Sequence, residues 1–190
     1  MPPTTPTTIG PPSALPFPES LCHRCAAPPK YVRTARSTFV MCPLVAEKYP
    51  RQPVLQCALF RPPLVETERL VLREATPADG VAIARLWVAI EKASGARIGQ
   101  IGPLAQVVDG VEELEVSYHV DEPHRRRGFA VEGAAAVRDW AFARGHDHVI
   151  ALIRDDNAPS QAVARKLGMT PGQHATHAGL DHIVWRVARR

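Results

Sequence analysis

The chain has 190 residues, of which 45% are hydrophobic, and a formal net charge of +4. No apolar run approaches the length of a membrane span, and the first residues lack the basic start and apolar stretch of a secretory signal. We therefore expect a cytoplasmic protein with no membrane partner, built as one domain plus an extension.

The positive charge belongs to the first third of the chain. Residues 1–63 hold seven Lys and Arg against two acids, a balance of +5, whereas residues 64–190 hold 16 against 17, a balance of −1. A basic excess favours acidic partners, but so few scattered charges do not predict a nucleic-acid-binding protein.

Residues 1–20 are rich in Pro and Thr and offer little for a core, so we expect a disordered tail there. Residues 21–63 form a separate region that contains every cysteine of the chain: Cys22, Cys25, Cys42 and Cys57. The first pair has the C-x2-C spacing of a zinc knuckle, and four thiolates could hold one tetrahedral Zn²⁺. The alternative is four ordinary free or buried cysteines, because a second C-x2-C is missing.

Residues 64–190 alternate between strand and helix patterns. A strand is predicted over residues 65–76, and Thr76-Pro77 has the features of a helix start, with the helix running to about Trp87. Strand patterns follow over residues 87–92 and 97–108, and Asp109-Gly110 predicts a hairpin into a central strand over residues 114–120. The predicted first helix and the next strand directly abut.

Residues 114–145 read as a strand, a basic loop with a glycine, and an Ala-rich helix that ends at Gly145. A helix start leaves backbone N–H groups unpaired and carries a partial positive charge. The run Arg125-x-x-Gly128-x-Ala130 therefore suits a phosphate or pyrophosphate. The alternative is a solvated arginine cluster beside an ordinary helix.

The remainder of the chain continues the alternation. Residues 146–155 predict a buried strand, Asn157 to Ser160 start a helix that ends at Gly168, and a closing hairpin is expected around Gly179. Strands alternating with helices around one sheet indicate α/β architecture.

Three segments, in this order, resemble motifs of the GNAT superfamily of N-acetyltransferases. They are residues 65–87, the turn over residues 125–130, and residues 156–169, the last in the form typical of ribosomal-protein N-terminal acetyltransferases. The resemblance implies an α/β fold with a mixed, mostly antiparallel central sheet flanked by helices. It also implies acetyl-CoA as the acyl donor and an amine as the acceptor.

The resemblance assigns residues to the donor. The pyrophosphate would lie on the turn made by Arg125, Arg126, Arg127, Gly128, Phe129 and Ala130. The thioester would lie where the central strand parts from its neighbour, beside the backbone amides of His119, Val120 and Asp121. Asn157 would bond the pantetheine arm, cap the next helix, or do both.

Two residues are candidates for the chemistry. Glu115, on the central strand, could act as general base, or it could be a solvated strand carboxylate. Many family members use a motif tyrosine to protonate the departing thiolate, but Ala164 occupies that position here. The resemblance gives this role to Ser160, whose alternative is a helix first-turn serine that satisfies the backbone.

Two functions fit these patterns. The first is an N-acetyltransferase that acts on a protein N-terminus or a small-molecule amine. The second is a non-catalytic CoA-binding remnant fused to a zinc-knuckle interaction module. Glu115 and Ser160 favour the first. The added cysteines favour the second, as does the region after the first helix, which is contracted because the resemblance implies a second helix there and the sequence has none.

Overall fold

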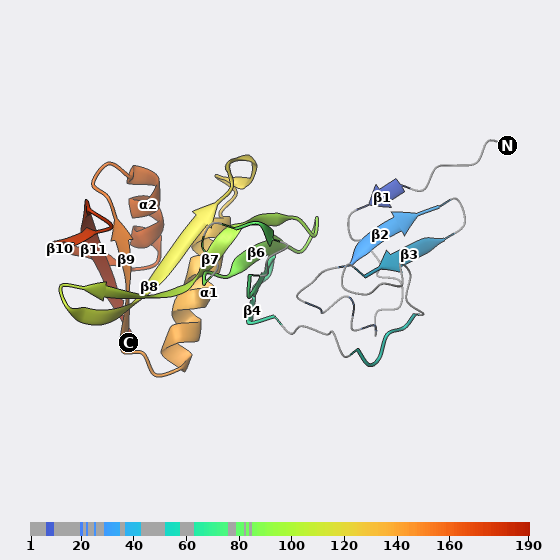
Figure 1. Ribbon diagram of the computed structural model, residues 1–190, viewed down its shortest axis with the longest axis horizontal. Helices are drawn as coiled ribbons and strands as arrows, with labels where there is room; N and C mark the ends of the chain where they lie inside the picture. The colour runs from blue at the N-terminus through green and yellow to red at the C-terminus, as the bar shows by residue number, and fades with distance from the viewer. Residues whose placement is uncertain are drawn as a thin grey trace.

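The computed structural model describes residues 7–9, 20, 22, 25, 29–34, 37–42, 52–57, 63–75, 79–81, 83 and 85–190. These residues form a three-stranded and an eight-stranded sheet (Figure 1). No helix in the described part of the chain is long and apolar enough to cross a bilayer.

The three-stranded sheet is antiparallel, in the order β1 (Thr7–Ile9), β2 (Lys30–Arg33) and β3 (Thr38–Met41). Its small core gathers Tyr31, Val40 and Cys22. Strand β1 falls within the tail predicted to be disordered, and apart from β1 and Ser20 that tail lies outside the described residues. The division of the chain at residues 20 and 63 stays a prediction.

The eight-stranded sheet has the strand order β10-β11-β9-β8-β7-β6-β5-β4. Its strands are β4 (Val65–Glu66), β5 (Leu70–Arg73), β6 (Val88–Glu91), β7 (Arg97–Val108), β8 (Val111–Val120), β9 (His148–Ile153), β10 (Thr170–His177) and β11 (Leu180–Ala188). Every neighbouring pair is antiparallel except β8 and β9, which a helix connects and which run parallel. The predicted mixed, mostly antiparallel α/β fold is confirmed.

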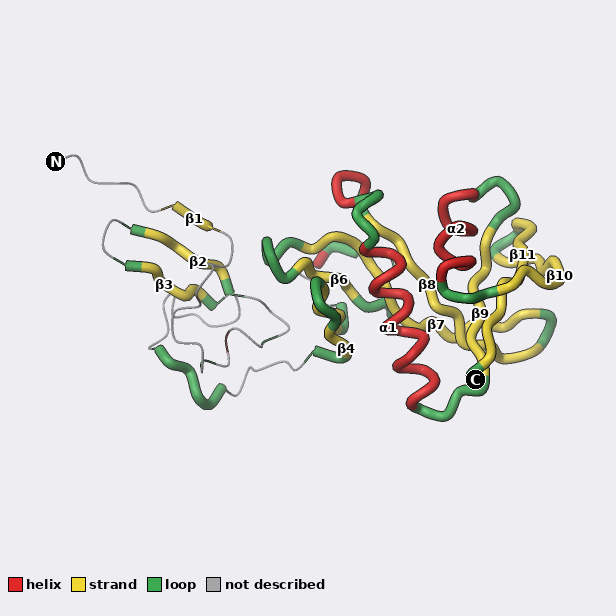
Figure 2. The backbone as a smooth tube through the Cα atoms, turned by 180° about the vertical axis from the view of Figure 1, so that it is seen from behind, coloured by secondary structure: helices red, strands yellow, loops and turns green. Residues whose placement is uncertain are grey.

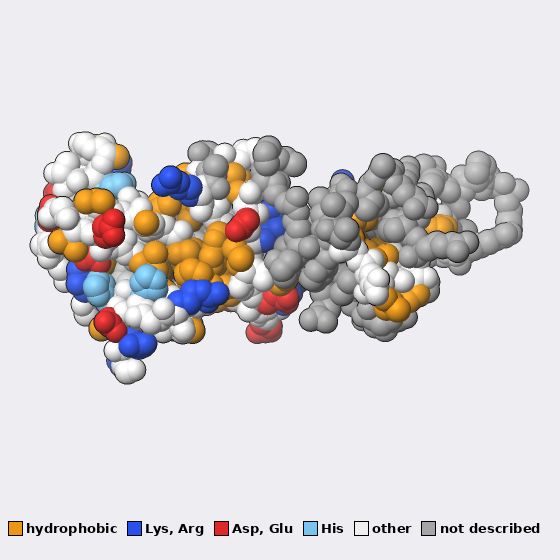
Figure 3. Space-filling view, turned by 60° about the horizontal axis from the view of Figure 1, so that its bottom comes forward, with side chains coloured by type: hydrophobic (Ala, Val, Ile, Leu, Met, Phe, Trp, Pro, Cys, Tyr) orange, Lys and Arg blue, Asp and Glu red, His pale blue; other side chains and the backbone are white. Residues whose placement is uncertain are grey.

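Helices α1 (Phe129–Ala143) and α2 (Ala158–Lys166) pack on the same face of this sheet (Figure 2). Helix α1 buries Phe129, Ala134, Val137 and Ala141 against Val116 and Val120 of β8. Alternation along the strand directs the side chains of both valines to the helical face. In another view of the part of the molecule that contains the eight-stranded sheet, hydrophobic side chains form a patch bordered by charged and histidine side chains (Figure 3).

Glycines end both helices as the sequence predicts. At the end of α1, the N–H groups of Gly145 and His146 donate to the carbonyls of Phe142 and Ala141, and Gly168 and Met169 repeat the arrangement after α2. This is the Schellman pattern, which satisfies the last carbonyls of a helix. It fixes the point at which each helix turns back toward the sheet.

The helix predicted over residues 76–87 is wrong for the part of it that the structure describes. Residues 79–81, 83 and 85–87 form a short 3₁₀ turn, a loop and a bend. Asp79 does not act as a first-turn acid, because both of its oxygens bind the Arg73 guanidinium of β5 at 2.6 and 2.9 Å. The side chain of Gln100 donates to the Ile83 and Leu86 carbonyls, which ties this loop to β7.

Gly99 generates a prediction about the centre of the sheet. It lies opposite Val120, its φ is +150°, and an added Cβ would lie 2.1 Å from the His119 carbonyl oxygen. Gly99→Ala must therefore push β7 away from β8, and we expect it to lower the free energy of unfolding by more than about 2 kcal/mol in urea denaturation.

Gly110→Ala is the matched control for this prediction. Gly110 also has a positive φ, of +81°, but an added Cβ there meets nothing within 4 Å. Its cost should be limited to backbone strain, roughly 1 kcal/mol. Equal losses for the two variants would contradict the proposed overlap.

Candidate active site

Strands β8 and β9 part soon after they meet. Their only register pair is Glu115 with Ile150, within a stretch that the structure describes completely, whereas β8 pairs with β7 from Val111 to Val120. Beyond Glu115, one edge of the β8 backbone therefore faces a gap instead of a strand. This parted pair of strands is where the sequence predicted the thioester.

The direction of the β8 amides corrects part of that prediction. The Asp121 N–H donates to the Ile98 carbonyl of β7 at 2.8 Å. Because alternate residues of a strand address the same neighbour, His119 also directs its amide toward β7. Of the three predicted residues, Val120 alone directs its N–H toward the gap, and the prediction is wrong for the amide of Asp121. The His119 side chain is 66% exposed.

Glu115 lies at the point where the strands part. Its carboxylate accepts a hydrogen bond from Gln106 Nε2 at 2.8 Å, and it also interacts with the backbone N–H of Leu152 on β9. If β8 and β9 continued to pair as parallel strands, the Leu152 N–H would bind a carbonyl of β8. The Glu115 carboxylate therefore lies where the pairing of the two strands ends.

Glu115 is only 8% exposed. Burial raises the pKa of Glu115 above the ordinary glutamate value, against the opposing effects of Gln106, Leu152 and two histidines, His177 and His182. A carboxylate with a raised pKa beside a strand gap is suited to taking a proton.

The glycine turn presents unpaired backbone donors. Gly128 has a φ of +86° and Arg126 a φ of +61°, and the first bond into the helix runs from the Glu132 N–H to the Gly128 carbonyl. The N–H groups of residues 126–131 make no hydrogen bond within the described part of the chain. A row of free N–H groups at a helix start is an anion-binding arrangement.

The turn is held by residues that the sequence did not single out. Arg69, in the turn between β4 and β5, binds the carboxylate of Glu132 and donates to the Arg127 carbonyl at 3.0 Å. The guanidinium groups of Arg69 and Arg127 each lie 4.7 Å from the centre of the buried Phe129 ring. Phe129 is thus an anchor of the turn, and its side chain does not face solvent.

Two carboxylates, of which Glu91 is buried and Glu132 partly buried, complete this support. Glu91 of β6 binds Arg127, and hydrogen bonds from Ser94 and then Arg127 hold the pKa of Glu91 below its ordinary value, although burial opposes them. Burial also works against ionised Glu132, yet bonds from Thr67 and Arg69 hold the pKa of Glu132 low. Both acids therefore stay charged and keep two of the cations occupied.

The remaining cations differ in their availability. Arg125 uses Nε to bind the Val120 carbonyl at 2.8 Å, which leaves the rest of its guanidinium exposed. Arg126 makes no ion pair in the described part of the chain. The two side chains stand beside the free N–H groups with charge to offer an anion.

The start of α2 contacts a side chain of β8. The Asn157 side chain accepts the Ser160 N–H at 3.1 Å and so caps the helix, which was one of its two predicted roles. The Ser160 hydroxyl makes no hydrogen bond within the described residues, while its carbonyl accepts the Tyr118 hydroxyl at 2.9 Å. Burial and the charge of Glu115 raise the pKa of Tyr118, so it stays protonated.

Sequence reasoning missed several of these residues for different reasons. Arg69, Glu91 and Gln106 come from other strands and lie far from the motif in sequence, so no local pattern marks them. The ring of Tyr118 packs against the core on the α1 face. Its hydroxyl, which bonds the start of α2, could have been suspected because a buried phenol usually finds a partner.

The four cysteines do not form a metal centre in the structure. Cys22, Cys25, Cys42 and Cys57 are all described, and none of them is part of a disulfide. No three of their sulfur atoms converge closely enough to hold one ion among the described residues. The predicted zinc site is not supported.

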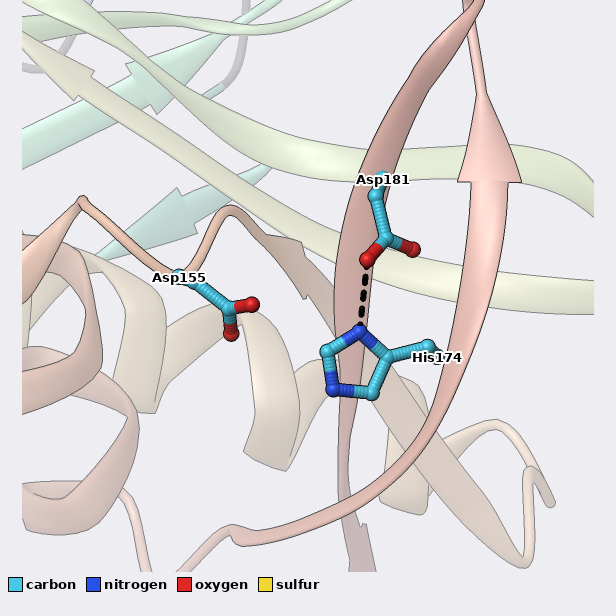
Figure 4. A group of neighbouring side chains, drawn as sticks. All are labelled: Asp155, His174 and Asp181. Atoms are coloured by element: carbon cyan, nitrogen blue, oxygen red, sulfur yellow. Dashed lines mark hydrogen bonds and ion pairs between the residues drawn. The ribbon is translucent and has the colours of Figure 1, made fainter.

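A different group of side chains could hold a cation. Asp155, His174 and Asp181, from the end of β9 and from β10 and β11, place donor atoms within 4.8 Å of one another (Figure 4). All three are exposed, and His174 Nδ1 already lies 2.8 Å from an Asp181 oxygen. That hydrogen bond raises the pKa of His174, and the ion pair accounts for their approach.

A cavity of about 440 Å³ lies elsewhere on the helical side, where the ends of α1, α2 and β11 meet. Its lining includes Arg138, Phe142, Leu167 and Arg189 and none of the predicted site residues. The cavity is therefore not part of the strand gap.

Comparison with known proteins decides the family. Residues 58–170 match the family described as the acetyltransferase (GNAT) domain, which is more than half of the chain. The chain belongs to the GNAT acetyltransferases. The resemblance inferred from the three motifs is confirmed.

Individual proteins match parts of the chain. The chain is 35% identical over 85 residues to the Bacillus subtilis protein YkkB, and 30% identical over 83 residues to the B. subtilis N-acetyltransferase YjdG. These matches cover 44% and 43% of the chain, and 49% of each relative, so the chain spans about half the length of the curated relatives it matches. An acetyltransferase from Agrobacterium tumefaciens superposes with a TM-score of 0.57 at 25% identity, over 70% of this chain and 99% of that one.

The raised pKa of Glu115 predicts a pH-dependent stability. The folded chain holds this proton more tightly than the unfolded chain, so stability falls as the pH rises from the unfolded value through the folded pKa. Glu115→Gln has no ionisable group at this position, so it does not lose stability in this way as the pH rises. Calorimetry should show a higher melting temperature than wild type at about pH 8, with the difference shrinking toward about pH 4.

Glu113→Gln is the control on the same strand face. Glu113 binds both His148 and Arg186, so its replacement should lower the melting temperature. If Glu115→Gln and wild type instead showed the same dependence on pH, the buried carboxylate would not be held in a proton-binding state.

Proposed function

We propose that this GNAT chain transfers an acetyl group from acetyl-CoA to a primary amine, either a protein N-terminus or a small molecule. The observation that carries the proposal is the row of unpaired N–H groups over residues 126–131, beside the gap between β8 and β9. It joins an anion-binding turn to a parted strand pair, which are the two features that a CoA thioester requires.

The residues of the turn fit the donor. The pyrophosphate would be held by the free N–H groups and by the exposed Arg125 and Arg126. Arg127 and Phe129 contribute differently from the sequence expectation, because they fix the backbone and are themselves bound to Glu91 and Arg69. Gly128 lets the ligand approach, since no Cβ covers the backbone there.

Glu115 supplies the base in this proposal. It removes a proton from the ammonium form of the acceptor, because only a neutral amine has the lone pair to attack. The new N–C bond forms as the C–S bond breaks, and the attacking nitrogen releases one further proton, which ends on the departing sulfur as the CoA thiol. The Val120 N–H would bind the carbonyl oxygen while negative charge develops on it.

The departing thiolate needs a proton or a hydrogen-bond donor. The Ser160 hydroxyl is suited to this step, because it makes no hydrogen bond to the protein and stands on the first turn of α2. The positive end of that helix also favours a thiolate. Asn157 holds the turn in place through its cap.

Donor and acceptor would approach from opposite faces of the sheet. The glycine turn leads into α1 on the helical face, whereas Glu115 alternates with the core residues Val116 and Leu114 and so points to the other face. This separation leaves the acceptor side free of the CoA-binding turn. The competing function, a CoA-binding remnant with an interaction module, differs by its lack of turnover.

Acetyl-CoA binding yields a direct prediction. At about 100 times the dissociation constant, binding adds ~2.7 kcal/mol and should raise the melting temperature by roughly 5–10 °C. Gly128→Asp should abolish this rise, because it adds a carboxylate to the anion site at a φ of +86°. Gly145→Asp, with a φ of +91° at the other end of α1, should retain it. If Gly128→Asp kept the same rise as wild type, the turn would not be the phosphate site.

Turnover separates the two functions. Release of free CoA would be followed against a panel of small amines and peptide N-termini. Glu115→Gln should lower kcat by about 10²–10⁴-fold, with little change in acetyl-CoA binding. Glu113→Gln, two residues away on the same face, should keep most of the activity. No turnover with any amine would favour the non-catalytic function.

A further inference from the structure

The side chain of Gln106 has a single partner among the described residues. It lies half-buried on β7, and its Nε2 donates to Oε2 of the Glu115 carboxylate at 2.8 Å. It makes no other side-chain hydrogen bond in that part of the chain, so it neither caps a turn nor ties a loop to the sheet. The polar role of Gln106 is therefore exerted on Glu115.

This pairing is not the one that strand register alone favours. Gln106 lies directly opposite Glu113 on β8, and Glu115 is its diagonal neighbour on the same face. Both oxygens of Glu113 are already occupied, one by His148 Nε2 and the other by Arg186, each at 2.5 Å. The amide of Gln106 is thus left to Glu115, and two acids on one strand face receive different partners.

Glu115 receives neutral donors. The Gln106 amide reaches it from β7 and the Leu152 N–H from β9, so its carboxylate is held from the strands on both sides of β8. A carboxylate that is only 8% exposed needs such donors when it is ionised. A cation in the same place would favour the charged form so strongly that the group would accept a proton poorly.

The other titratable or charged groups around Glu115 come from β8 to β11, and none is bonded to its carboxylate within the described residues. They are Glu113, Tyr118, His148, His177, His182 and Arg186. In that part of the chain, Gln106 is thus the one side chain that bonds this carboxylate.

We propose that Gln106 is a positioning residue for the base. Its amide holds the Glu115 carboxylate in one orientation where β8 and β9 part, and because the amide is neutral it leaves the carboxylate able to take a proton from the acceptor. The effect of Gln106 on turnover rests on the proposed acetyl transfer. Its effect on the protonation of Glu115 can be measured without turnover.

The test changes the amide in two opposite ways in the full chain. Gln106→Met removes the donor and keeps a side chain of similar length, so the midpoint of the Glu115 titration should move up by about one pH unit. Gln106→Lys places a cation there and should move the midpoint down by about one pH unit or more. Carbon-13 NMR of the carboxyl groups measures both, and Glu115→Gln identifies the resonance.

Val107→Met and Val107→Lys are the matched controls. Val107 is the next residue of β7, is 64% exposed and directs its side chain to the other face of the strand. The same two side chains placed there should leave the titration of Glu115 unchanged. The acetyl-CoA-induced rise in melting temperature checks that each variant is folded.

Kinetics then connect the contact to the reaction. The acidic limb of the pH profile of kcat/KM for the amine should move up in Gln106→Met and down in Gln106→Lys, with the KM for acetyl-CoA unchanged. A merely structural role would not move the limb in opposite directions. Gln106→Met should regain most of the wild-type activity above its new midpoint.

The outcomes separate this inference from the proposed function. A titration midpoint that stays at the wild-type value in either Gln106 variant, or that moves the same way in both, would overturn the role of Gln106 and leave the acetyltransferase in place. No turnover by the wild-type chain would overturn the proposed function. The NMR midpoints would still decide whether Gln106 controls the protonation of Glu115.

Discussion

The parting of β8 and β9 at Glu115 is the constraint on which the rest of the site depends. The carboxylate interacts with the N–H of Leu152 at the level where a parallel ladder would continue, and the two strands share one register pair. A buried charge stabilised in this way is costly for the fold. The buried Glu115 carboxylate places a group that can accept a proton next to an open strand edge. The energetic cost of burying it is thus tied to its proposed role as a base.

At the glycine turn, several arginines lie close together, and their mutual repulsion is reduced by acidic partners. Glu91 and Glu132 neutralise Arg127 and Arg69, and Phe129 lies between the two guanidinium groups. These contacts fix the backbone so that its N–H groups point outward before any ligand arrives. Preorganised donors bind an anion without the cost of ordering a loop.

Much of the fold follows from the sequence because its signals are local. Alternation gives the central strand, Gly145 and Gly168 end the helices, and Gly179 turns the last hairpin. The helix expected after Thr76 was wrong in its described part because Asp79 binds Arg73, a contact that no local pattern contains. The amide of Asp121 was misassigned because strand register decides which edge an N–H addresses, and composition does not report register.

The contacts of Arg69 determine how much of the chain before α1 is needed to hold the glycine turn in place. It belongs to the turn between β4 and β5, yet it binds Glu132 on α1 and the carbonyl of Arg127. The hairpin of β4 and β5 is therefore structurally coupled to the glycine turn more than 50 residues later. Shortening the chain past Arg69 would leave most of the strands of the eight-stranded sheet in place while removing this clamp on the turn.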